Sequence, residues 1–237
     1  MRAITKGLIV SAAGLFFGTF ASAGSLSGTV TTPSAAVNLT TEGTADWAHY
    51  GLTNATTVNR KSTGGSQISV PTLIGTGSTK AQLTDSPSRY SWTDGTPTAS
   101  FSSTPNGIYI NNFNGPGRGF QFTVPADTTS RTLEVFLGEF DASGTLEATL
   151  SDNSAPVFSN TLTGAANQTV QGMYTLNYTA NTPGQTLTVK WTETADLGQF
   201  DNVTLQAVAL KVASVPEPTT IALGFAGLTL LSIRRRK

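Results

Sequence analysis

The feature that most constrains the fold of this chain is a series of short segments in which apolar and polar residues alternate one by one. In the first clear segment, residues 120–124, three apolar side chains share one face and Gln121 and Thr123 lie on the other. A period of two is typical of a β-strand with one dry and one wet face. The predicted dry faces are Phe120, Phe122 and Val124; Leu133, Val135 and Leu137; Leu146, Ala148 and Leu150; Tyr174, Leu176 and Tyr178; Leu187, Val189 and Trp191; and Val203, Leu205, Ala207 and Ala209.

The breaks between these segments carry turn residues, as in residues 125–127, 141–144, 151–153 and 181–184. No window between the two chain ends shows a convincing helical period, and Thr, Ser, Gly and Asn are abundant. We therefore predict an all-β domain over residues 24–214, a single antiparallel β-sandwich of jelly-roll type. Its first half is less regular, with strands expected near Thr29, Val37–Leu39, Ile68–Val70 and Ile108–Ile110.

The N-terminus, residues 1–23, has the three parts of a secretory signal peptide and is expected to form a signal helix. Arg2 and Lys6 supply the basic region, residues 7–20 the apolar region, and Ala21-Ser22-Ala23 the cleavage site. The chain has no cysteine, so the exported domain has no disulfide or thiol chemistry.

The C-terminus, residues 215–237, combines a rigid motif, an apolar segment and a basic end. The motif is Val215, Pro216, Glu217 and Pro218, and its prolines disfavour helix. Residues 219–233 carry no charge and can form a short transmembrane helix, although 15 helical residues cover only ~22 Å. The membrane-stop residues are Arg234, Arg235, Arg236 and Lys237, which favour the cytoplasmic side.

This tail resembles the PEP-CTERM sorting signal of Gram-negative, exopolysaccharide-producing bacteria, with all three parts in order. The resemblance implies an exosortase-type processing enzyme and the general secretion machinery as partners. It also implies that the chain is held only transiently in the inner membrane, and then delivered to the cell surface or the extracellular space. An ordinary tail anchor is the alternative, but the segment is short for a hydrocarbon core of ~30 Å.

Net charge argues against nucleic acid as a partner. Six of the 14 basic residues and one of the 14 acidic ones lie in the two terminal segments. Residues 24–214 therefore hold 8 basic and 13 acidic residues, a net charge of −5. Such a domain repels phosphate backbones.

Two aromatic runs are candidates for ligand binding. The first contains Asp46, Trp47, the single histidine His49, and Tyr50; the second contains Tyr90 and Trp92. Exposed, these rings would stack on sugar rings while Asp46 and His49 bond hydroxyl groups. The alternative, which we favour, is that they are core residues of the sandwich.

Residues 198–205, Gly-Gln-Phe-Asp-Asn-Val-Thr-Leu, resemble the closing strand of galactose-binding-like jelly-roll domains. The resemblance implies the fold and a rim that faces sugar or holds calcium. Calcium prefers several converging oxygen ligands, for which Asp152 and Asp201 are candidates; no other cofactor is expected.

The expected function is that of an exported, non-catalytic surface or matrix protein that binds polysaccharide in a biofilm. The sequence contains no G-x-S-x-G or H-E-x-x-H motif and no second histidine. The alternative is a secreted carbohydrate-active hydrolase with paired carboxylates, for which Glu139 and Asp141 are the nearest pair. Alternation alone would make these two acids solvated side chains.

Overall fold

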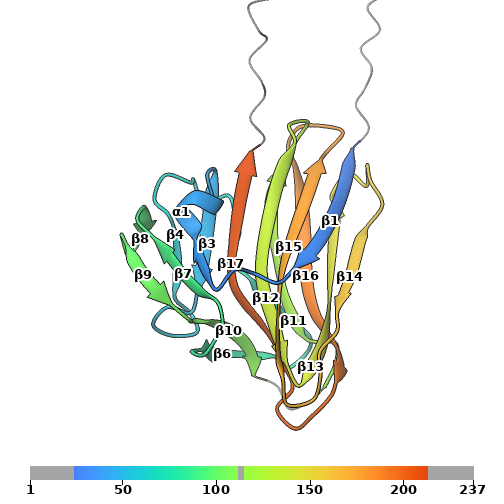
Figure 1. Cartoon of the computed structure of the whole chain (residues 1–237). Coiled ribbons are helices and arrows are strands. Elements are labelled where there is room, and N and C mark those ends of the chain that lie inside the picture. Colours follow the sequence, from blue (N-terminus) through green and yellow to red (C-terminus); the bar gives the residue numbers. More distant parts are fainter. Residues whose placement is uncertain (1–23, 112–114, 213–237) are drawn as a thin grey trace, which may run out of the picture.

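The computed structural model describes residues 24–111 and 115–212, which form a β-sandwich of two large antiparallel sheets with a smaller third sheet on one side (Figure 1). This confirms the predicted fold class. The larger sheet has nine strands in the order β1-β15-β12-β17-β3-β4-β8, with β10 beside β17 and β6 beside β10. Its strands are β1 (Ser25–Thr31), β3 (Asp46–Tyr50), β4 (Val58–Lys61), β6 (Thr79–Leu83), β8 (Gly95–Thr96), β10 (Gly107–Asn111), β12 (Arg131–Phe140), β15 (Thr169–Thr179) and β17 (Asn202–Val212).

The second sheet has five strands in the order β14-β13-β16-β11-β5. They are β5 (Thr72–Ile74), β11 (Gly119–Ala126), β13 (Ala142–Leu150), β14 (Phe158–Leu162) and β16 (Gln185–Asp196). The alternating apolar residues of both sheets, Phe122, Val135 and Trp191 among them, are buried in one core between the sheets. Burying each such side chain stabilises the fold by about 1.5–3 kcal/mol, so this core specifies the sandwich.

A three-stranded sheet, β2-β7-β9, covers part of the outer face of the nine-stranded sheet, the face that points away from the five-stranded sheet. It consists of β2 (Ala36–Asn38), β7 (Arg89–Trp92) and β9 (Phe101–Thr104), with the short helix α1 (Leu39–Glu42) beside it. A second core lies between these two sheets and contains Trp47, Tyr90, Trp92 and Phe136.

In β17, the prediction that Val203, Leu205, Ala207 and Ala209 share one face is wrong. Val203 and Leu205 point into the sandwich core, but Ala207 and Ala209 belong to the second core. The reason is a β-bulge: Leu205 pairs with Leu137 and Ala207 with Phe136, so Gln206 is an extra residue. The bulge turns the second half of the predicted face to the other side of the sheet.

Two predicted strands in the first half differ from the structure. Residues 68–70 form no strand, because the Gln67 and Ile68 N–H groups donate to the Asp46 carboxylate at 2.7 and 3.2 Å instead of to a sheet partner. Leu39 begins α1 rather than ending a strand, since the Asn38 side chain accepts the Thr40 N–H at 3.1 Å and caps the helix.

Candidate functional site

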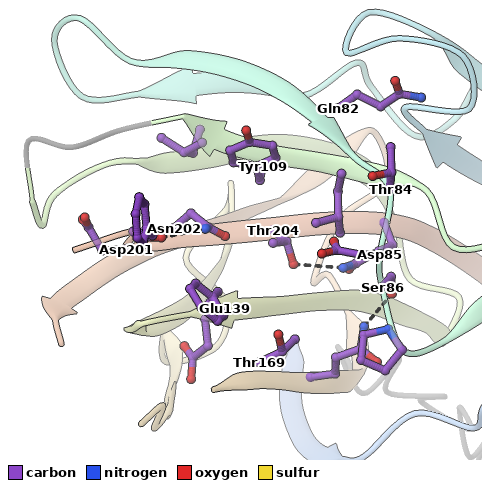
Figure 2. A pocket seen from close by; sticks show the side chains of 17 residues that line it. Gln82, Thr84, Asp85, Ser86, Tyr109, Glu139, Thr169, Asp201, Asn202 and Thr204 are labelled. Atoms are coloured by element: carbon purple, nitrogen blue, oxygen red, sulfur yellow. Dashed lines mark hydrogen bonds between the residues drawn. The ribbon is translucent and has the colours of Figure 1, made fainter. Parts of the chain in front are cut away.

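A cavity of about 370 Å³ opens on the outer face of the nine-stranded sheet, beside the three-stranded sheet (Figure 2). Its floor contains Gln171, Thr204 and Tyr109. These three lie in one row across four strands, in which Gly138 stands between Gln171 and Thr204. Each of them alternates with residues that point into the sandwich core, so each faces outward. The walls are residues 83–87, which connect β6 to β7, and residues 200–202, which precede and begin β17.

Gly138 makes room at the centre of the floor. A Cβ atom at this position would lie 2.8 Å from the Val170 carbonyl oxygen and 3.1 Å from Thr204 Oγ1. The first distance is too short for any side chain. Glycine therefore leaves a gap in the middle of the row, between Gln171 and Thr204.

Hydrogen bonds fix the polar side chains around this gap. Gln171 donates from Nε2 to Ser86 Oγ at 2.6 Å and accepts from the Ser88 hydroxyl at 3.0 Å, which joins β15 to the wall segment. On β17, Gln206 is 1% exposed and donates from Nε2 to Thr204 Oγ1 at 2.9 Å. The cavity is thus held by side chains that are already oriented.

The lining combines aromatic and hydroxyl or amide groups. Tyr109 is half-buried in the floor, and Phe200 is 55% exposed at the wall. Thr84, Thr169 and Thr204 contribute hydroxyl groups. Aromatic rings beside a few placed polar groups are the usual composition of a site for a hydroxylated small ligand.

Beneath this floor, three carboxyl side chains are buried at one end of the sandwich: Glu139, Glu193 and Asp201. Glu139 continues the inward-facing series of β12, and Figure 2 shows its carboxyl group on the side of the strand away from Thr204. Burial raises the pKa of Glu139 to about 8, and the nearby Gly144 N–H lowers it only in part. Burial, and then the neighbouring Asp201 carboxylate, also raises the pKa of Glu193. Burial therefore favours the protonated form of both glutamates.

Glu139 and Asp141 do not form the solvated pair expected from alternation. Both are buried, at 0% and 1% exposure. Asp141 lies at the turn between β12 and β13 with a φ of 54°, and its carboxylate accepts the Asn167 N–H. The left-handed turn breaks the alternation, so the two side chains are held by different neighbours.

The six residues predicted for ligand binding are all buried: Asp46, Trp47, His49, Tyr50, Tyr90 and Trp92. The structure brings the two runs together, with the Trp47 and Trp92 ring centroids 5.3 Å apart, but it does so in the second core. Tyr50 lies instead in the sandwich core. None of the six lines the outer-face cavity. Their positions are those of the core alternative.

The environment of His49 disfavours a role in acid–base chemistry. Its ring is fully buried between Trp92 and Tyr90, with centroids 5.0 and 5.7 Å away, and Nε2 lies 3.1 Å from the Asn106 carbonyl oxygen. Burial lowers its pKa to about 3, so the ring stays neutral. Asp46 is engaged by the N–H groups of Trp47, Gln67 and Ile68 and is a loop anchor rather than a partner of His49.

The two calcium candidates lie apart. Asp152 follows the end of β13 and accepts the N–H groups of Ser154 and Asn181. Asp201 lies near Glu193, which pairs with the start of β13. The two cannot share one ion, and within residues 24–111 and 115–212 no three Asp, Glu or His side chains gather as metal ligands.

The sorting motif Val215 to Pro218, the membrane-stop residues Arg234 to Lys237 and the signal segment 1–23 lie outside the described residues. In the part of the chain that is described, no helix has the length and apolar character needed to cross a membrane.

Sequence reasoning missed most of the cavity. Of its lining, only Glu139 and the run 198–205 had been singled out. The run, noted for its likeness to a jelly-roll closing strand, supplies Phe200, Asp201, Asn202 and Thr204. Tyr109 and Asp85 carried no signal, because each stands alone in an unremarkable stretch. The pairing of β10 with β17 brings Tyr109 to the site.

Comparisons with known proteins identify only distant structural neighbours. No family model matches the chain. No curated protein matches it either. The chain is similar to the enzymatically active domain of tailspike protein 4 of bacteriophage CBA120, with 10% identity and a TM-score of 0.36, over 62% of this chain and 20% of that one.

Two further solved structures are matched over most of their length. One is TmCBM61 in complex with β-1,4-galactotriose, at 9% identity and a TM-score of 0.40, over 61% of this chain and 90% of that one. The other is the K2 cleaved adhesin domain of Lys-gingipain, at 14% identity and a TM-score of 0.40, over 72% and 100%. At these identities and TM-scores the matches carry no information on what this chain binds.

Proposed function

We propose that this chain is an exported, non-catalytic carbohydrate-binding protein of the cell surface or biofilm matrix, and that the outer-face cavity is its binding site. The observation that carries the proposal is the cavity itself. Its volume of about 370 Å³ is that of a small-ligand pocket, and Tyr109 and Phe200 accompany several hydroxyl and amide groups in its lining. Pyranose rings present C–H faces to aromatic rings and hydroxyl groups to polar side chains.

Preorganisation supports binding rather than a purely structural role. Gln171 and Gln206 are held by hydrogen bonds within the protein, so a ligand meets groups whose orientation costs little further entropy. A floor made from neighbouring strands of one sheet is also rigid.

A glycan array probed with the full-length chain in detergent, with and without calcium, tests the proposal. Tyr109→Ala should weaken the best hit about three- to tenfold, because one stacking contact is lost. Phe200→Ala should weaken it similarly, whereas Val157→Ala should not. Phe200 and Val157 are both 55% exposed, but Val157 does not line the cavity, so it is the matched control. Absence of any glycan binding above background would overturn the proposal.

Hydrolysis of a glycan is the second candidate, and Glu139 is the observation that favours it. Glu139 is among the residues that line the cavity, and burial raises its pKa to about 8, as a general acid requires. Its carboxyl group points into the sandwich, so catalysis would require this side chain to turn toward the cavity. Release of new reducing ends from a glycan that binds on the array would establish hydrolysis, provided that Glu139→Gln abolishes the release. Binding without product, over a long incubation, would support the non-catalytic proposal.

Export, exosortase processing and transient anchoring in the inner membrane remain proposals that rest on residues 1–23 and 215–237. The charge of −5 for the part between them suits a domain that persists in water.

A further inference from the structure

Two of the unsatisfied polar atoms in the lining of the outer-face cavity are amide oxygens, which can only accept hydrogen bonds. Gln206 Oε1 and Asn202 Oδ1 are both buried and have no partner among the described residues. The amide nitrogen of each is already used, by Thr204 Oγ1 and by the Phe200 carbonyl oxygen, both at 2.9 Å. Buried acceptors without donors are costly, so a ligand that supplies donors gains more here than in water.

Acids are the only residues of the Asp, Glu, Lys, Arg and His types in the described lining. Asp85, Glu139 and Asp201 line the cavity, and no Lys, Arg or His does so among the described residues. Glu139 and Asp201 face the sandwich interior, which leaves Asp85 as the exposed carboxylate at the wall. Figure 2 shows Asp85 and Asn202 on either side of Thr204, so acceptors flank the floor from two directions.

We propose that the cavity selects a glycan unit that carries a free amino group, that is, a hexosamine without its N-acetyl group. This inference rests on the proposed function and narrows its ligand class. An ammonium group has three donors and no acceptor, which suits a lining with one exposed carboxylate, Asp85, and two amide oxygens without a donor, on Gln206 and Asn202. Its positive charge is also favoured beside the Asp85 carboxylate, which is exposed at the wall of the cavity.

The same geometry disfavours the common alternatives. An N-acetyl group replaces two donors and the charge by a bulky amide, whose carbonyl oxygen adds an acceptor to a lining that already holds acceptors without donors. A uronate brings a carboxylate toward Asp85, and like charges at an interface are repulsive. Neutral hydroxyl groups fit the acceptors but gain nothing from the charge.

The experiment compares four oligosaccharides of equal length by isothermal titration with the full-length chain in detergent. They are a glucosamine trimer, its N-acetylated form, a neutral glucose trimer and a galacturonate trimer. The glucosamine trimer should bind about tenfold tighter than the N-acetylated and neutral trimers, and the galacturonate trimer most weakly. The preference should shrink as salt is added, since the pair with Asp85 is partly exposed.

Asp85→Asn is the test variant and Glu147→Gln the matched control. Both remove one exposed carboxylate, but Glu147 lies on the outer face of the five-stranded sheet, away from the cavity. Asp85→Asn should reduce glucosamine-trimer affinity about fivefold and neutral-trimer affinity much less, while Glu147→Gln changes neither.

The outcomes distinguish failure of the amino-sugar inference from failure of the carbohydrate-binding function. Equal or tighter binding of the neutral or N-acetylated trimer overturns the amino-sugar inference and leaves the carbohydrate-binding function standing. An equal effect of Asp85→Asn and Glu147→Gln also overturns the inference, because net charge alone would then explain it. Failure of every trimer and every array glycan to bind overturns both.

Discussion

Replacing Glu139 by Gln should change how the stability of the protein depends on pH. Glu139 is fully buried, and neither carboxyl oxygen has a hydrogen-bond partner of normal geometry among the described residues. Burial raises its pKa from the usual 4.5 to about 8. Gln has nearly the same shape and cannot ionise, so the substitution removes the titration and little of the packing.

The sign follows from the order of the two pKa values. Below pH 4.5 the carboxyl group is protonated in both the folded and the unfolded chain, and its contribution to stability is fully present. As pH rises toward about 8, the unfolded chain releases the proton while the folded chain keeps it, so stability is lost. At 1.36 kcal/mol per pKa unit, the loss at pH 7 is at most roughly 3 kcal/mol.

Urea unfolding of wild type and Glu139→Gln between pH 4.5 and 8.5, with a metal chelator present, measures the effect. The difference in free energy of unfolding between the variant and wild type should increase in favour of the variant by about 1.4 kcal/mol for each pH unit from 5 to 7. An amide N–H left without a partner costs about 1–3 kcal/mol at every pH, which displaces the curve and leaves its slope unchanged. Parallel curves for the two proteins would refute the reasoning. Glu147→Gln, at an exposed acid, serves as the control and should run parallel to wild type.

Three further predictions concern the second core, its polar anchor and the tail. Trp92→Ala should lower the free energy of unfolding by about 3–5 kcal/mol, because the ring is 1% exposed and packs on Trp47, His49 and Phe101. A loss below about 1 kcal/mol in urea unfolding would contradict the assignment of Trp92 to the core. Asp94 accepts hydrogen bonds from Thr40 at 2.6 Å, from Trp47 Nε1 at 3.0 Å and from Lys61, so Asp94→Ala should lower the free energy of unfolding by about 2 kcal/mol. Although burial opposes it, these bonds hold the pKa of Asp94 below its usual value, so wild type should lose this stability as pH falls below about 4. If Asp94→Ala lost stability below about pH 4 as steeply as wild type does, this role of Asp94 would be contradicted. Replacing Pro216, Glu217 and Pro218 by Ala should leave the unprocessed chain in the membrane fraction, as judged by intact mass, and normal release would reject the sorting role of the motif.

The second half of the fold was predictable because its strands follow a strict period of two with turn residues between them. The dry faces of β11, β12, β13, β15 and β16 are buried as predicted. The prediction was wrong where local hydrogen bonding replaces the period: at the Gln206 bulge, at the Asn38 cap, and at residues 67–68, whose N–H groups bind Asp46. These features depend on one side chain or one inserted residue, which periodicity does not register.

The cavity could be predicted only in part, because it is a product of strand order. Gln171, Gly138, Thr204 and Tyr109 are scattered over about 100 residues and become neighbours only through the pairing of β15, β12, β17 and β10. The aromatic runs were the stronger sequence signal, yet large rings in a sandwich are most often core, and Trp47 and Trp92 are core here.

Hydrogen–deuterium exchange with and without a saturating glycan from the array would test the central claim most directly. The account predicts that protection is confined to the cavity segments, residues 82–87, 139–140, 169–171 and 200–206, and to the strand that carries Tyr109. Protection that appears instead over residues 46–50 and 89–92, or on the outer face of the five-stranded sheet, would contradict it.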